Sequence, residues 1–239
     1  NGDRSDLINY ILKKKNEGDF KVIDVGGSVN GWSSPYVDAV VDFNDLEKNN
    51  TNIKHFKCDI THPDSYEEIL NYVNKNGKFH FCICTHTLED IINPVYVCEQ
   101  ICKISNEGYI SFPSKFRELS RFEGGNYRGY IHHRWIFKVK DGNKIVAFPK
   151  INLIENNKLF DKIANMSDDL KDLSFYWKDN IEINYVNNNY LLFEINTDIS
   201  GNDYYLNAVA KGYDPVQNGE LVLLFKPAYV EYAATGTTH

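Results

Sequence analysis

The first half of the chain alternates short apolar runs with helix-like patterns, and this alternation restricts the fold more than any other feature. Helical periodicity precedes the first run and follows the third and fourth runs, over residues 7–12, 64–74 and 94–104. Strands that alternate with helices pair in parallel through crossovers. The fold class we expect is therefore α/β, a Rossmann-like, doubly wound and mostly parallel sheet. The expected strands are residues 22–25, 39–42, 55–59, 79–84 and 109–112.

This rhythm stops at Pro113, so we expect residues 1–113 to form a cofactor-binding core. Residues 114–180 would be an inserted cap with a hairpin, residues 181–232 would add strands that complete the sheet, and residues 233–239 would be a disordered tail.

Within the later part, Asp141-Gly142-Asn143 separates two apolar runs and predicts the hairpin of the cap. The other elements that we expect are helices over 152–165 and 168–176, a second hairpin from 181–186 and 190–195, and a strand over 221–225.

Composition excludes several classes of protein. The 239 residues carry a net charge of −7, which argues against a broad nucleic-acid duplex interface. No run approaches the roughly 20 apolar residues of a membrane span. The five cysteines are an odd number without paired zinc-type spacing, so we expect buried free thiols and a cytoplasmic protein.

Acidic residues end three successive expected strands. Asp24 ends a buried strand that runs into Gly26 and Gly27, a sequence that lets a ligand approach the backbone at the sheet edge. Asp42, 18 residues later, can accept both hydroxyls of an adenosine ribose. Asp59 can accept the exocyclic amine of an adenine. The alternative for each acid is a turn cap at a strand end.

These motifs together resemble the class I S-adenosylmethionine-dependent methyltransferases, over about residues 18–113. The loop departs from the family pattern at Ser28 and Asn30, where further glycines are usual. The resemblance implies S-adenosylmethionine as cofactor and S-adenosylhomocysteine (SAH) as product. The residues that carry it are the stretches 22–27 and 81–90, Asp42, 58–60 and 108–110. The implied cofactor-binding residues are Asp24, Gly26, Gly27, Ser28, Asp42, Asp59, Ile60 and Thr85.

A locally basic segment follows the fifth expected strand and suggests an anionic acceptor, since Arg offers bidentate hydrogen bonds to phosphate or carboxylate. A solvated loop or a salt-bridge network is the alternative. The substrate-binding residues that we expect are Arg117, Arg121, Arg128, Arg134 and Tyr130.

Three histidines are candidate general bases: His86, His132 and His133. His86 is placed near the donor methyl group only by the family resemblance. We expect no metal site, because neighbouring residues on a strand point to opposite faces and His132 and His133 would then not share an ion.

The function that we expect is methyl transfer, as O-methylation, to a small anionic acceptor such as a sugar nucleotide, a phosphorylated or phosphoramidate group, or a glycan precursor. Surface polysaccharide biosynthesis enters only by analogy with relatives of the same fold. One alternative is an NAD-dependent oxidoreductase or epimerase, although the expected central region has no YxxxK pair. Another is a catalytically inactive methyltransferase-like scaffold.

Overall fold

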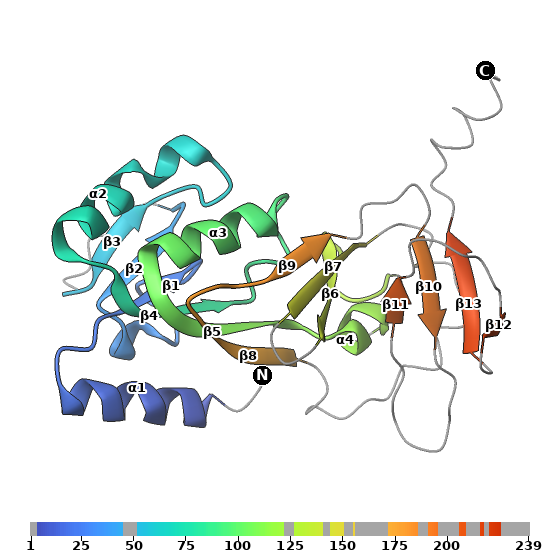
Figure 1. Cartoon of the computed structure of the whole chain (residues 1–239), viewed down its shortest axis with the longest axis horizontal. Coiled ribbons are helices and arrows are strands. Elements are labelled where there is room, and N and C mark those ends of the chain that lie inside the picture. The colour runs from blue at the N-terminus through green and yellow to red at the C-terminus, as the bar shows by residue number, and fades with distance from the viewer. Residues whose placement is uncertain are drawn as a thin grey trace.

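The structure is a computed structural model (Figure 1). It describes residues 4–44, 52–121, 127–140, 144–150, 155 and 172–185, together with the backbone of four later strands. Within these residues, no helix is both long enough and apolar enough to cross a bilayer.

The central sheet has six strands in the order β3-β2-β1-β4-β5-β8. The first five are parallel to one another and β8 runs antiparallel to β5, which confirms the α/β, mostly parallel fold. The strands are β1 (Val22–Val25), β2 (Ala39–Asp42), β3 (Lys54–Lys57), β4 (Phe79–Thr85), β5 (Ser105–Pro113) and β8 (Asp172–Lys178).

Helices cover both faces of this sheet (Figure 1). α1 packs on one face, where Leu7 and Ile11 meet Val22 of β1. α2 and α3 pack on the other face, where Ile23 and Val25 are buried. Burial on both faces explains why β1, β2 and β4 are nearly continuous apolar runs rather than alternating ones. The helices are α1 (Ser5–Glu17), α2 (Glu67–Asn76) and α3 (Pro94–Ile104), with short 3-10 turns η1 (Ser34–Tyr36) and η2 (Pro63–Tyr66).

A second sheet of three strands lies beyond β5 in the order β6-β7-β9. β6 (Trp135–Lys140) and β7 (Lys144–Pro149) form the predicted antiparallel hairpin, and β9 (Ile183–Tyr185) joins β7 in parallel. The short helix α4 (Lys115–Leu119) precedes the hairpin. The ring centroids of Phe112 and Phe137 lie 4.4 Å apart, so the small sheet shares one core with the central sheet.

The predicted helix over 168–176 is wrong where the structure describes it, because residues 172–178 are β8. Phe175 and Trp177 are buried while Ser174 and Tyr176 are exposed, and this period of two belongs to a strand. The strand that completes the central sheet therefore comes from the segment predicted as a cap, not from residues 181–232.

The second predicted hairpin is also wrong, because β9 pairs with β7 and not with β10. A separate sheet has the order β11-β10-β13-β12. Its strands are β10 (Leu191–Ile195), β11 (Leu206–Ala208), β12 (Val216–Gln217) and β13 (Glu220–Phe225), the last of which agrees with the predicted strand over 221–225. The predicted helix over 152–165, apart from residue 155, and the predicted disordered tail over 233–239 lie outside the described residues.

The cysteines behave as the sequence indicates. All five are free thiols, four are buried and Cys102 is half-buried. Cys82 and Cys84 face the same core cluster from alternate positions of β4.

Candidate functional site

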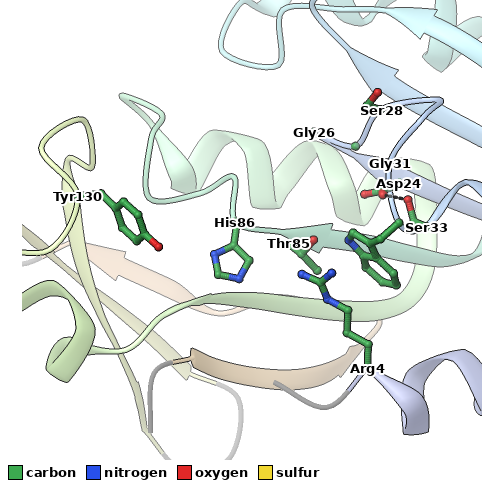
Figure 2. A pocket seen from close by; sticks show the side chains of 11 residues that line it. Arg4, Asp24, Gly26, Ser28, Gly31, Ser33, Thr85, His86 and Tyr130 are labelled. Carbon is green, nitrogen blue, oxygen red and sulfur yellow. Dashed lines mark hydrogen bonds between the residues drawn. The ribbon is translucent and has the colours of Figure 1, made fainter. Parts of the chain in front are cut away.

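A pocket of about 360 Å³ opens at the carboxyl ends of β1 and β4, the edge at which the sequence places the cofactor. Figure 2 shows its labelled side chains running from Tyr130 through His86 and Thr85 to Arg4 and Ser33. Its lining residues are Arg4, Asp24, Gly26, Gly27, Ser28, Gly31, Trp32, Ser33, Thr85, His86 and Tyr130.

Asp24 is the buried charge of this pocket, with only 2% of its surface exposed. Its Oδ2 accepts a hydrogen bond from the Ser33 hydroxyl. Burial raises the pKa of Asp24 to about 6, while Ser33 and the charge of Arg4 oppose that rise. At neutral pH the carboxylate is therefore mostly ionised and attracts a positive charge in the pocket.

The two glycines after β1 are needed for close packing around this carboxylate. A Cβ on Gly27 would overlap the carboxylate of Asp24. Gly26 has a φ of +78°, donates its N–H to the Val41 carbonyl at 2.9 Å, and a Cβ there would overlap the Thr87 side chain. Larger residues would therefore displace Asp24 or the end of β4.

The loop closes without the further glycines of the family pattern. The Ser28 carbonyl accepts hydrogen bonds from the Gly31 N–H at 2.8 Å and from the Ser34 hydroxyl at 3.0 Å. Its hydroxyl accepts the Asn30 N–H at 3.3 Å. Neither Ser28 nor Asn30 has a positive φ, so glycine's conformational freedom is not required at these positions.

Asp42 and Asp59 do not line the pocket and instead act as turn caps, the alternative that the sequence left open. Oδ1 of Asp42 accepts hydrogen bonds from both the backbone and the side-chain amide of Asn44. Oδ1 of Asp59 accepts the hydroxyl of Thr61 at 2.7 Å and its N–H at 2.9 Å, which lowers the pKa of Asp59. Ile60 is buried and also lies away from the lining.

Sequence reasoning missed Arg4 and Trp32. The Arg4 guanidinium lies 4.3 Å from the centroid of a Trp32 ring, a cation–π contact across the pocket. Arg4 precedes the first helix and carries no motif, so no local signal identifies it. Trp32 directly follows Gly31 of the glycine loop, and this position is the one sequence feature that could have placed Trp32 at the pocket.

His86 lines the pocket and is held between two carboxylates. Its Nε2 lies 3.5 Å from Asp172 and its Nδ1 lies 3.4 Å from the buried Glu89. Asp172 first and Glu89 second raise the pKa of His86 to about 9. The ring is therefore a cation at neutral pH, which does not suit it to remove a proton, and the two carboxylates balance its charge.

The backbone of His86 is also unusual, with a φ of +51°, and its N–H donates to the Ser111 carbonyl at 2.9 Å. Positive φ is rare for a residue other than glycine. β4 and β5 therefore fix the direction in which the imidazole leaves the sheet edge.

His132 and His133 lie outside the pocket lining, in the turn that precedes β6. Because they are not on a strand, the expectation that they face opposite ways is wrong. Their ring centroids lie 4.6 Å apart. The Nε2 atoms of both lie near Oδ1 of Asp90, at 3.7 Å from His132 and 3.6 Å from His133.

Of the residues expected to bind the acceptor, Tyr130 lines the pocket and the four arginines do not. Arg117 donates to the Tyr130 hydroxyl at 3.1 Å. Arg121 and Arg128 bond to the chain elsewhere, through the Glu155 carbonyl and the Leu119 carbonyl respectively. Arg134 donates its Nε–H to the Asp90 carbonyl at 3.0 Å. These bonds match the structural alternative and not an open anion cradle.

Comparison of the sequence with models of protein families gives no match, and comparison with curated proteins gives none either. Among solved structures, the chain is similar to the N-terminal domain of EvdMO1 with SAH bound, at 13% identity and a TM-score of 0.33, over 74% of this chain and 70% of that chain. It is also similar to that domain in the presence of SAH and D-fucose, at 14% identity and a TM-score of 0.33, over 74% and 69%. SAH and D-fucose are ligands of the EvdMO1 structures.

Proposed function

We propose that this chain is an S-adenosylmethionine-dependent methyltransferase that acts on a small anionic acceptor. One observation carries the proposal: the buried, ionised Asp24 and the close-packed Gly26-Gly27 turn line a pocket at the carboxyl edge of the parallel sheet. A buried negative group at a pocket favours a cationic ligand, and the methyl donor carries a sulfonium and an ammonium.

The loop after β1 disfavours a dinucleotide in the same pocket. A dinucleotide places its pyrophosphate at the N-terminus of a helix that follows the glycine turn. Here the turn leads to η1, a single 3-10 turn of three residues, and then to β2. The sixth strand also runs antiparallel to β5, whereas the dinucleotide fold continues with a second parallel βαβαβ half.

We assign the cofactor to the residues that line the pocket, namely Asp24, Gly26, Gly27, Ser28 and Thr85. Arg4 offers a guanidinium for the carboxylate of the amino-acid part, and Trp32 offers an aromatic face for stacking. Asp42, Asp59 and Ile60 remain proposed contacts for the ribose and adenine. Among the described residues the turn caps engage Oδ1 of each carboxylate, and the Oδ2 atoms would serve as the acceptors there.

The acceptor is proposed to be anionic because two guanidinium groups lie at the pocket, that of Arg4 in its lining and that of Arg117 against the Tyr130 hydroxyl. An anionic oxygen is itself a nucleophile and requires no base. In the transfer, that oxygen forms the new bond to the methyl carbon while the carbon–sulfur bond breaks, so SAH leaves neutral at sulfur and the acceptor loses one negative charge. Both ring nitrogens of His86 already face carboxylates, so catalysis would rest mainly on positioning of the two reactants in the pocket.

The test is thermal unfolding of the purified chain with SAH, with NAD in parallel. A ligand at about 100 times its dissociation constant stabilises by about 2.7 kcal/mol, an increase in melting temperature of roughly 5–10 °C for a chain of this size. Gly27→Ala should abolish the increase with SAH, because the added Cβ overlaps Asp24. Gly18→Ala is the matched control, because a Cβ there meets nothing within 4 Å. An increase with NAD and none with SAH would overturn the proposal, and no increase with either would favour the scaffold.

A further inference from the structure

A cluster of possible metal ligands lies beside the pocket, built by Asp90, His132 and His133. One ligand atom of each residue lies within 4.8 Å of the other two. Asp90 follows β4 by five residues and the histidines precede β6, so the fold brings together positions about 40 residues apart. No ion is present in the structure.

The spacing fits a tetrahedral ion. Bonds of about 2.0–2.2 Å to nitrogen and oxygen place the ligand atoms of a tetrahedral zinc site about 3.3–3.6 Å apart. The Asp90 Oδ1 atom lies 3.7 Å from Nε2 of His132 and 3.6 Å from Nε2 of His133. The nitrogens of the two histidines lie within 4.8 Å of each other, so coordination by all three residues needs the histidines to move together by about 1 Å at most.

The surroundings of His133 orient it as a ligand. Its Nδ1 lies 2.6 Å from Oε1 of the buried Glu118. A carboxylate at that distance accepts a hydrogen bond from Nδ1–H, and the tautomer with that proton has its Nε2 lone pair directed at Asp90 and His132, the carboxylate–histidine arrangement common behind metal ligands. Glu118 is held in turn by Lys150, whose Nζ donates to Oε2 at 2.8 Å.

The cluster is open on one side. His133 is 6% exposed in its side chain, whereas Asp90 is 43% and His132 is 62% exposed. Three protein ligands and an open fourth position are typical of a zinc site that binds water or substrate, not of a closed structural site. Tyr130 connects the cluster to the pocket, since it lines the pocket and its ring centroid lies 4.5 Å from that of His133.

We propose that Asp90, His132 and His133 form a binding site for one divalent transition-metal ion, with zinc as the best fit, and that Glu118 positions His133. Two imidazoles and one carboxylate suit zinc and its neighbours in the first transition row, in preference to magnesium or calcium. The site does not depend on the proposed methyl transfer, because it takes its ligands from outside the cofactor residues.

The experiment measures metal binding to the full chain after treatment with a chelator, by calorimetry with Zn²⁺ and by visible absorption with Co²⁺. We expect one ion per chain and a tetrahedral Co²⁺ spectrum without a thiolate charge-transfer band. His132→Ala and Asp90→Asn change exposed side chains and should weaken Zn²⁺ by about 100-fold or more, since loss of an outer partner alone costs about 10–100-fold. His62→Ala is the matched control, an exposed histidine outside the cluster.

Glu118→Gln tests the positioning role. It should weaken Zn²⁺ about 10–100-fold while keeping one ion per chain, with folding checked by circular dichroism. Absence of tight Zn²⁺ and Co²⁺ binding would overturn the proposal. A thiolate charge-transfer band in the Co²⁺ spectrum would also overturn it. So would a Zn²⁺ affinity of the His132→Ala and Asp90→Asn variants that stays within threefold of that of the unmodified chain.

Discussion

Replacement of Asp172 by Asn tests the electrostatics of the pocket most directly. His86 lies between Asp172 and Glu89, and Asp172 is the larger cause of its raised pKa. In return, the pKa of Asp172 lies below its usual value: burial raises it, and the hydrogen bond and charge of His86 are the largest of the causes that lower it. Asp172→Asn removes the carboxylate that raises the pKa of His86 more than Glu89 does, and it keeps the shape of the side chain.

The expected magnitude follows from the pKa of His86. The difference between the usual 6.5 and about 9 corresponds to about 3 kcal/mol at about 1.4 kcal/mol per pKa unit. The His86 side chain is 34% exposed, so solvent screening reduces this to about 1–2 kcal/mol. Since the pKa is raised on folding, this stability is fully present below pH 6.5 and is lost as the pH rises through about 9.

The assay is an NMR titration of the His86 ring, with urea unfolding at pH 6.5 and pH 9.5. In the unmodified chain, the ring should titrate near pH 9 and the free energy of unfolding should fall by about 1–2 kcal/mol between the two pH values from this group. Asp172→Asn should lower the titration midpoint by about one pH unit or more and reduce that fall. Asp64→Asn, an exposed acid away from the pocket, should change neither. A His86 midpoint below pH 7 in the unmodified chain would refute the reasoning.

Two further substitutions test the packing that builds the site. Ser33→Ala should destabilise the chain by about 1–3 kcal/mol and raise the pKa of Asp24 further, because a buried carboxylate loses its hydroxyl donor. Urea unfolding measures the loss of stability, and a variant as stable as the unmodified chain would contradict the prediction. Phe137→Ala should lower the free energy of unfolding by about 3–5 kcal/mol, since the Phe137 ring centroid lies 4.4 Å from that of Phe112 and the ring joins the small sheet to the central core. If thermal unfolding shows a loss of less than 1 kcal/mol, the two sheets do not share one core.

The sequence predicts the first half of the fold well because its strands, apart from the edge strand β3, are mostly buried on both faces and are followed by a recognisable turn or helix. β1 and β4 are apolar runs whose ends carry Asp24 and Thr85, and the structure brings both to one pocket. Residues 172–178 were predicted as a helix although Phe175 and Trp177 alternate with Ser174 and Tyr176 with the period of a strand, and the pairing of β8 with β5 joins positions about 60–70 residues apart. A local pattern carries no information about such a partner.

The site was predicted only in part for the same reason. Residues adjacent to the glycine turn could be found, whereas Arg4 reaches the pocket from before α1 and has no motif. The arginines after β5 were expected to face an anion, but their hydrogen bonds go to the chain itself, since a buried guanidinium such as that of Arg128 requires acceptors. The sequence shows that a segment is rich in arginine, but it does not show in which direction each guanidinium points.

The unusual glycine turn is itself informative about the ligand. A pyrophosphate needs bare backbone and a helix N-terminus after the first strand. Here Ser28 uses both its carbonyl and its hydroxyl to close the turn, and the three residues of η1 are the only helical ones between Ser28 and β2. The positions kept as glycine are those that pack against Asp24 and Thr87. The turn therefore keeps the close packing that places the buried carboxylate and lacks the features that phosphates require, which is the combination expected for a cationic ligand without phosphates.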